Sequence, residues 1–206
     1  MGNWIDWHDA YEHPGSSLSR RLEVVRERLR TALDGAGPSP TVLSLCSGDG
    51  RDVIGTLTGR PTPTGRVVLV EADEDLAERA RRMAEVQNLT QVEVRCRDAG
   101  AVESFIDVVP VDVLLLCGIF GNIDHPTVKR VVEAVPGLVR TGGYVIWTRG
   151  GSEPDRRPEI RGWFAEAGME EVAFDGAPEP YGVGLNRVTI PGHSPGLGPE
   201  RLFSFR

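Results

Sequence analysis

Two kinds of hydrophobic pattern alternate along the chain: apolar residues spaced three or four positions apart, and short continuous apolar runs. Between residues 17 and 33, apolar side chains lie three or four residues apart with arginines between them, which predicts an amphipathic helix. Short runs rich in valine and leucine follow and predict strands, and the continuous run at 111–116 is typical of a strand buried on both faces. The pattern predicts helices over 17–33, 51–57, 74–86, 126–135 and 158–167, and strands over 41–45, 66–70, 92–95, 111–116, 144–148, 172–174 and 202–205.

Polar and small residues mark the ends of these elements. Ser16 or Ser17 is placed to cap the first helix, Asp124 to begin the fourth, and Gly168 to close the last. Residues 141–143 predict a turn before the fifth strand. Glycine- and proline-rich connectors are expected at 34–40, 59–65 and 176–184.

Alternation of strands and helices predicts an α/β fold with a doubly wound, mostly parallel sheet. No helix separates the last two predicted strands, so we expect an antiparallel, hairpin-like C-terminal end. In such sheets ligands bind beyond the carboxyl ends of the strands. The residues that directly follow each strand are therefore the candidates for a binding site.

Composition narrows the class of protein. A chain of 206 residues, 40% of them hydrophobic and 26% charged, suits a single globular domain. A net charge of -7 argues against a nucleic-acid partner. The chain has no apolar run of about 20 residues for a membrane helix, and its polar N-terminus does not resemble a signal peptide. Three cysteines without CxxC spacing favour a reducing cytoplasm over a disulfide framework or a metal site.

A glycine-bearing turn follows the first strand, in the segment Cys46-Ser47-Gly48-Asp49-Gly50. Glycine permits a sharp turn and a close approach by a ligand. Taken alone, this segment could also be an ordinary strand-to-helix turn.

Acidic residues follow the second and third strands. Glu71, 21 residues after Gly50, is placed to accept hydrogen bonds from two ribose hydroxyls, or it merely begins the acidic start of the next helix. Asp98, followed by Ala99, could accept a bond from an adenine amino group or cap a helix over 101–105. After the fourth strand, the small residues Cys117 and Gly118 suit the floor of a ligand cleft, or form a plain loop.

The pattern favours a nucleoside without a phosphate. A dinucleotide fingerprint needs a third glycine, where this chain has Val53. The phosphate-binding pattern GxxxxGK[ST] is also missing. S-adenosylmethionine contains ribose and adenine but no phosphate.

These motifs together resemble the class I S-adenosylmethionine-dependent methyltransferases. The resemblance covers residues 40–150 well and the remainder loosely. It implies a Rossmann-like methyltransferase sheet and S-adenosylmethionine as the cofactor. The residues that carry it are 42–50 as motif I, 67–73 as the ribose-binding strand end, 97–99 as the adenine segment, 112–118 as motif IV, and 138–144 as the turn before the fifth strand.

The resemblance also implies roles for single residues. Cys46, Gly48 and Gly50 would line the methionine portion of the cofactor. Glu71 would hold the ribose and Ala72 would flank the adenine. The full candidate cofactor site is Cys46, Ser47, Gly48, Asp49, Gly50, Glu71, Ala72, Asp98, Ala99, Cys117 and Gly118, with the last two near the sulfonium.

The chain departs from the family pattern in two places. Many members carry a pair such as Gly-Cys where this chain has Cys46-Ser47. The tetrapeptide Asn/Asp-Pro-Pro-Tyr/Phe does not follow the fourth strand, which argues against methylation of amino groups on bases or amides.

The acceptor site is expected at the additions to this core. Residues 1–34 form an N-terminal arm and helix, in which Trp7 and His8 could cover the cofactor as a lid or pack elsewhere, and residues 35–206 form the cofactor-binding core. A general base is needed only if the acceptor must lose a proton, and Tyr11 and His125 are the candidates.

The sequence therefore predicts a cytoplasmic methyltransferase that acts on a small molecule, as a monomer or a homodimer. No metal, nucleic acid or membrane is expected to take part. Two alternatives remain open: a non-catalytic S-adenosylmethionine-binding protein, and an aminopropyl transferase on the same fold.

Overall fold

The computed structural model describes residues 13, 15–60, 65–190 and 200–206. Its centre is one seven-stranded sheet with the order β3-β2-β1-β4-β5-β7-β6. The strands are β1 (Val42–Leu45), β2 (Val67–Glu71), β3 (Val92–Cys96), β4 (Val111–Leu116), β5 (Val139–Gly150), β6 (Met169–Asp175) and β7 (Tyr181–Val188). The helices are α2 (Ser17–Gly35), α3 (Val53–Leu57), α4 (Glu74–Val86), α5 (His125–Leu138) and α6 (Arg157–Glu166), with a 3-10 helix over Val102–Ser104.

Strand direction confirms the expected doubly wound α/β fold. β1 pairs in parallel with β2 and β4, β2 with β3, and β4 with β5. β7 runs antiparallel to both of its neighbours, β5 and β6. The sheet is thus mostly parallel with one reversed strand near its C-terminal edge, as predicted.

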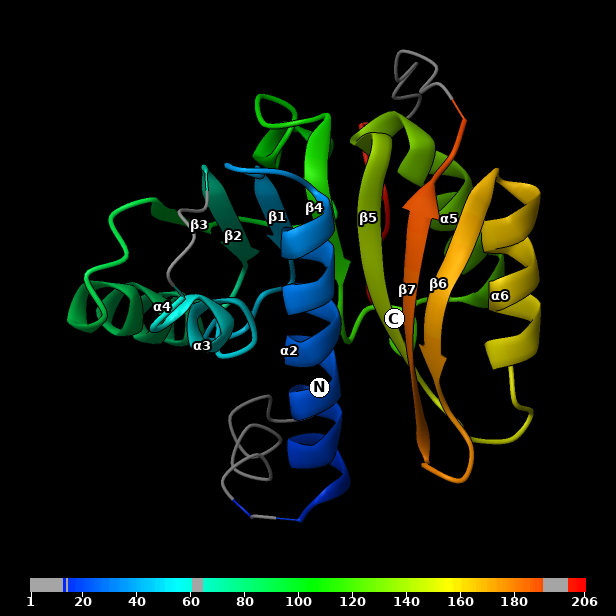
Figure 1. Ribbon diagram of the computed structural model, residues 1–206. Coiled ribbons are helices and arrows are strands. Elements are labelled where there is room, and N and C mark those ends of the chain that lie inside the picture. Colours follow the sequence, from blue (N-terminus) through cyan, green and yellow to red (C-terminus); the bar gives the residue numbers. More distant parts are fainter. Residues whose placement is uncertain (1–12, 14, 61–64, 191–199) are drawn as a thin grey trace.

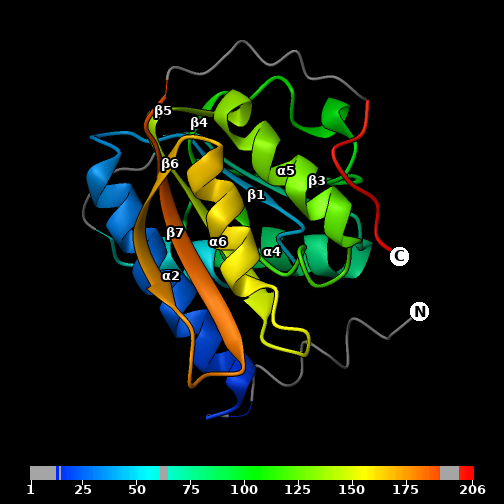
Figure 2. The same ribbon diagram turned by 90° about the vertical axis from the view of Figure 1, so that its right-hand side faces the viewer.

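Helices cover both faces of the sheet (Figures 1 and 2). Side chains alternate between the two faces along each strand. On β4, Leu114 and Leu116 pack into the hydrophobic cluster under α5 and α6, whereas Val113 and Leu115 pack into the cluster under α2, α3 and α4. Burial on both faces explains why this strand is apolar at nearly every position.

Side-chain caps fix where three helices begin. Ser16 Oγ accepts a hydrogen bond from the backbone N–H of Ser19 at 3.0 Å, so it is Ser16 that caps α2. Asp73 and Asp124 cap α4 and α5 in the same way. α5 continues through Pro136 to Leu138, although the sequence predicted an end at residue 135.

Two predictions about the C-terminal half were wrong. Residues 202–205 do not form a strand. Next to them, Arg201 forms a single isolated antiparallel bridge with Ala101. The last strand is instead Tyr181–Val188, part of which was predicted to be a connector. Glycine at 184 is required there because a Cβ would meet the Trp147 ring at 2.2 Å.

Two smaller predictions also need correction. The segment 141–143 belongs to β5, whose pairing with β4 shifts register between Val111 and Val113. The helix expected over 101–105 is only the short 3-10 turn. Among the described residues, no helix combines the length and apolar character needed to cross a membrane.

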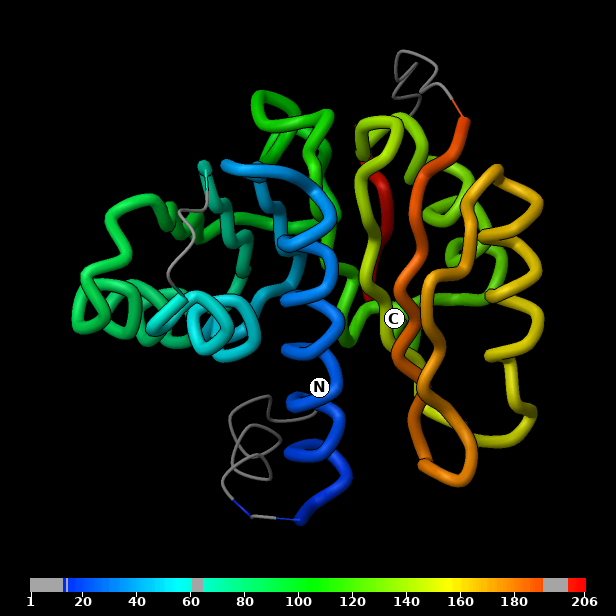
Figure 3. Tube along the Cα trace, in the orientation of Figure 1, coloured from blue at the N-terminus to red at the C-terminus, as the bar shows by residue number. Residues whose placement is uncertain are grey.

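The C-terminal segment 200–206 returns along the face of the sheet that α5 covers. Figure 3 shows it in red behind β5. Its backbone bonds to Gly100 and Val102, and Arg206 N donates to the Asn122 carbonyl oxygen at 3.1 Å. These contacts bring the end of the chain to the loop that follows β4.

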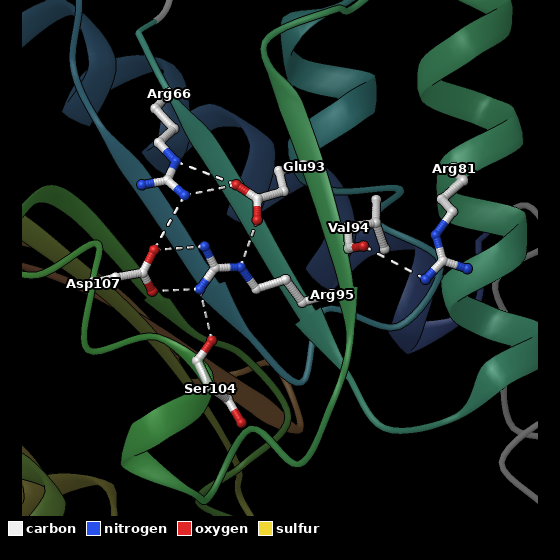
Figure 4. A network of polar contacts seen from close by, with 7 residues as sticks. All are labelled: Arg66, Arg81, Glu93, Val94, Arg95, Ser104 and Asp107. Atoms are coloured by element: carbon white, nitrogen blue, oxygen red, sulfur yellow. Dashed lines mark hydrogen bonds and ion pairs between the residues drawn. The ribbon is translucent and has the colours of Figure 1, made fainter.

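An ion-pair network fastens β2 and β3 to the loop before β4 (Figure 4). Arg95 bonds Glu93 at 2.7 Å and Asp107 at 2.6 Å, and it also donates to the Ser104 carbonyl oxygen at 2.9 Å. Arg66 joins the same two carboxylates at 2.8 and 3.2 Å. The network thus holds the edge of the sheet to that loop.

Candidate functional site

A cleft of about 360 Å³ opens at the carboxyl ends of β1, β2 and β4. The three segments that follow these strands supply most of its wall. Parallel strands bring their carboxyl ends to one edge, which is why residues far apart in the sequence meet here. The lining residues are Arg21, Cys46, Ser47, Gly48, Glu71, Ala72, Asp73, Leu76, Cys117, Gly118 and Phe205.

The turn after β1 has left-handed backbone at three positions. Cys46, Gly48 and Gly50 have φ values of 54°, 57° and 71°. Glycine adopts this region without strain, whereas a residue with a Cβ does so rarely. At Gly50 a Cβ would also lie 2.9 Å from side-chain atoms of Ile54 and Leu69. Gly50 therefore permits tight packing of α3 on the sheet, while Cys46 adopts a conformation that glycine would hold more easily.

Glu71 ties the first two strand ends together. Its Oε2 accepts a hydrogen bond from Gly48 N at 2.7 Å, and its Oε1 accepts one from Asp73 N at 3.0 Å. The side chain is half-buried at the cleft wall. The two N–H groups fix the carboxylate plane and leave each oxygen with a further lone pair.

The two cleft cysteines are held as neutral thiols. Burial raises the pKa of Cys46, and the nearby carboxylates of Glu71 and Asp98 raise it further. Burial likewise raises the pKa of Cys117. Next to Cys117, Gly118 N donates to Thr148 Oγ1 at 2.8 Å, which fixes the loop after β4 against β5.

Four of the predicted cofactor residues do not line the cleft. Asp49 is buried in an ion pair with Arg51, and Gly50 packs beneath the turn. Ala99 is buried, and Asp98 forms a 2.7 Å ion pair with Arg201 while its Oδ1 accepts a bond from Gly100 N. The other seven, Cys46, Ser47, Gly48, Glu71, Ala72, Cys117 and Gly118, do line the cleft.

Four lining residues were not among the predicted site residues. Asp73 is the last residue of the ribose-binding motif 67–73 and was not singled out, and Leu76 lies three residues beyond it, so a wider motif window would have included it. Arg21 comes from α2, and Phe205 from the returning C-terminal segment. No local pattern signals these last two, because tertiary packing alone brings them to the cleft.

The candidate catalytic residues lie apart from this cleft or outside the described residues. His125 begins α5, and its Nε2 lies 2.7 Å from Glu159 Oε2. Its ring centroid lies 4.6 Å from that of Trp163. It lines a second, smaller cavity rather than the cofactor cleft. Tyr11, Trp7 and His8 are outside the described residues.

Half-buried Asp52 caps the start of α3. Its Oδ1 accepts a hydrogen bond from Val53 N at 2.7 Å. Burial raises the pKa of this carboxyl to about 6, and nearby Asp49 adds to the shift. The carboxyl is thus costly to ionise.

Comparison with known proteins gives matches in structure but not in sequence. No family model matches the sequence, and no curated protein matches it. A possible exported protein from Bordetella parapertussis superposes with a TM-score of 0.67 at 15% identity, over 83% of this chain and 68% of that one. An O-methyltransferase family protein from Burkholderia thailandensis gives 0.66 at 18% identity, over 83% of this chain and 56% of that one.

A third structure matches over most of both chains. The N-terminal domain of EvdMO1, in the presence of SAH and D-fucose, gives a TM-score of 0.59 at 17% identity, over 81% of this chain and 83% of that domain. The chain spans just over half the length of the O-methyltransferase family protein. Identities this low establish the fold alone. Together with the strand order and the reversed β7, these matches show that the chain has the fold of the class I S-adenosylmethionine-dependent methyltransferases.

Proposed function

We propose that this chain binds S-adenosylmethionine in the cleft and transfers its methyl group to a small-molecule acceptor. The geometry of the Glu71 carboxylate is the observation that carries the proposal. Its carboxylate is oriented by two backbone N–H groups and faces a cleft with one acceptor site left on each oxygen. Two vicinal ribose hydroxyls need such a pair of acceptors. A similarly folded domain, that of EvdMO1, has SAH in its structure, which supports the same choice of ligand.

The remaining walls suit the rest of the cofactor. Ala72 and Leu76 offer apolar surface for the adenine ring. Arg21 lines the same cleft as Cys117, which places a cation near the end of β4. We assign Arg21 to the carboxylate of the methionine portion, as a charge-assisted pair.

Neutral thiols also fit this ligand. The cofactor supplies an electrophilic methyl group, and a thiolate beside it would compete with the acceptor as a nucleophile. Burial keeps Cys46 and Cys117 protonated at neutral pH. The cleft can then hold two cysteines near the sulfonium without either being methylated.

Methyl transfer requires mainly that the acceptor atom be held in line with the methyl group. If the acceptor must lose a proton, His125 remains our candidate for the base. With a neutral ring and the proton on Nε2, the bond to Glu159 leaves Nδ1 as the basic atom. A carboxylate that orients a histidine in this way is a common arrangement for a general base.

Calorimetric titration of the full chain with S-adenosylmethionine, S-adenosylhomocysteine and NADH tests the binding step. We expect saturable binding of the first two and none of NADH. Binding of NADH alone, or of no ligand, would refute the proposal. An acceptor screen that monitors release of S-adenosylhomocysteine then tests transfer, and binding without transfer to any acceptor would favour the non-catalytic alternative.

Two arginine variants test the assigned orientation of the cofactor. Arg21→Gln should weaken S-adenosylhomocysteine binding about tenfold, in line with the loss of one charge-assisted bond. It should leave methylthioadenosine binding unchanged, because that molecule has no carboxylate. Arg20→Gln is the matched control, since Arg20 pairs with Glu179 and does not line the cleft. Equal losses for both ligands would contradict the assignment.

A further inference from the structure

A second cavity, of about 160 Å³, lies beyond the ends of β4 and β5. Three arginines from separate parts of the chain line it: Arg149 at the end of β5, Arg156 before α6, and Arg206 in the C-terminal segment. Phe120, Ile123 and Val128 border it but are almost fully buried. The surface that the cavity offers is therefore mainly polar and positively charged.

The positive charge in this cavity is only partly balanced. Glu153 is the one carboxylate among its lining residues. Arg156 bonds Glu159 at 3.2 Å, but His125 shares the same carboxylate oxygen. Nearby Asp155 is bound by Arg157 through two side-chain bonds of 2.9 Å. Arg206 lies near Asp124 and donates to the Ile123 carbonyl oxygen at 2.9 Å. Among the described lining residues, three guanidinium groups thus face one carboxylate, while Glu159, Asp124 and Asp155 offset part of the charge from outside the cavity.

Arg149 carries the strongest sign of a missing partner. Its Nη1 donates to the Phe120 carbonyl oxygen, but its buried Nε has no hydrogen-bond partner among the described residues. Buried donors are nearly always paired in folded proteins. Burial and the neighbouring charges of Arg206 and Arg156 lower the pKa of this guanidinium. An anion in the cavity would place negative charge beside this guanidinium.

The cavity adjoins the cofactor cleft. Gly118 lines the cleft and Phe120, two residues later, lines the cavity. Likewise, Phe205 lines the cleft and the next residue, Arg206, lines the cavity. The loop after β4 and the end of the chain therefore separate the two spaces by the width of a single segment. A molecule anchored in the cavity could extend toward the sulfonium side of the cleft.

We propose that this cavity is the anchor for the acceptor, and that it selects an acceptor bearing a carboxylate or phosphate group. Arg149 and Arg156 bind the anionic group. The inference rests on the proposed methyl transfer for its functional meaning, but anion binding can be measured independently of transfer.

The test uses three small ring compounds that differ in the group they carry. Benzoate, phenyl phosphate and the neutral benzamide are titrated calorimetrically into the full chain, with and without saturating S-adenosylhomocysteine. We expect one anion per chain and binding of benzamide at least about tenfold weaker, since a charged acceptor strengthens hydrogen bonds to arginine. Comparison of benzoate with phenyl phosphate shows which of the two groups the cavity prefers.

Charge-neutral variants locate the binding. Arg149→Gln and Arg156→Gln should each weaken anion binding about tenfold, as expected for the loss of one charge-assisted contact. Neither residue lines the cofactor cleft, so affinity for S-adenosylhomocysteine should not change. Arg82→Gln is the matched control, because it removes the same charge from an exposed position on α4. Arg156 is 40% exposed, so its variant should fold even if the Arg149 variant does not.

The outcomes separate this inference from the proposed function. If S-adenosylhomocysteine fails to bind, the proposed function fails, while the anion titrations without it still report on the cavity. If anions do not bind, if benzamide binds as well as benzoate, or if Arg156→Gln and Arg82→Gln bind anions equally, the inference is overturned.

Discussion

Replacement of Glu71 by alanine tests the cofactor site and the fold of its turn together. Glu71 accepts backbone hydrogen bonds from Gly48 at 2.7 Å and from Asp73 at 3.0 Å. The variant leaves both N–H groups without this partner. It also removes the acceptors proposed for the ribose hydroxyls. Stability and affinity should therefore fall together.

The size of each effect follows from these contacts. Buried hydrogen bonds to a charged group contribute about 1.5–3 kcal/mol each, but water can reach this half-buried site and replace part of them. We expect the free energy of unfolding to drop by about 2 kcal/mol. Loss of the ribose contacts should cost a further ~1.5–3 kcal/mol of binding, which raises the Kd for S-adenosylhomocysteine about 10- to 100-fold.

Urea denaturation and calorimetric titration measure the two quantities separately. Asp75→Ala is the matched control, because Asp75 is an exposed carboxylate in the first turn of α4 that does not line the cleft. It should leave affinity unchanged. This control also tests the alternative that Glu71 is merely one of the acidic residues at the start of α4.

A second substitution tests the geometry in more detail. Glu71→Gln keeps the size of the side chain but has only one carbonyl oxygen, so its NH₂ group must face either Gly48 N–H or Asp73 N–H. We expect this variant to be about as unstable as Glu71→Ala. An unchanged Kd in Glu71→Ala would refute the ribose assignment, and wild-type stability in Glu71→Gln would refute the two-donor account of the carboxylate.

Three further predictions concern stability, each measured by urea denaturation. Cys46→Val should lower the free energy of unfolding by at least ~1 kcal/mol more than Cys117→Val does, because of these two only Cys46 has a positive φ, of 54°, where a β-branched residue is strained. Equal losses of stability in the two variants would contradict this. Burial raises the pKa of Asp52 to about 6, above its unfolded value, so its ionisation should lower stability as pH rises from 4 to 6. Asp52→Asn should therefore be more stable than wild type by roughly 2 kcal/mol at pH 7 but not at pH 4, and a gain that is independent of pH would refute the reasoning. Arg95 and Arg66 hold the pKa of Asp107 well below its usual range, so its contribution should be present above pH 4 and lost as the pH falls below that. Because Asp107 is half-exposed, Asp107→Asn should cost only ~0.5–1 kcal/mol at pH 7 and less in high salt; a loss that persists at high salt would contradict an ionic origin.

Much of the fold could be predicted from local sequence. β4 and α4 have the predicted bounds, because a continuous apolar run and a capped 3.6-residue period are both local signals. The cleft position also followed from sequence, since Gly48, Glu71 and Gly118 come directly after their strands. Parallel pairing then brings these ends together without further information.

Local patterns failed where contacts between distant residues decide the structure. Glycines at 182 and 184 predict a connector, yet the strand forms because Trp147 packs over Gly184 and bonds Asn186 at 2.8 Å. Residues 202–205 look like a strand but bond instead as an isolated segment beside Gly100. The motif residue Asp98 forms an ion pair with Arg201 from that same segment, a partner that no local pattern predicts, and its contact with adenine stays a prediction.

The sequence by itself therefore determined the order of elements, the doubly wound sheet and the edge at which a ligand would bind. These depend on hydrophobic period, caps and turn residues, which lie within a few positions of one another. Only the tertiary structure brought Arg21 and Phe205 to the cleft and gathered Arg149, Arg156 and Arg206 around a second cavity. Such groups form because packing of the whole chain brings distant segments together, and no local period records where those segments meet.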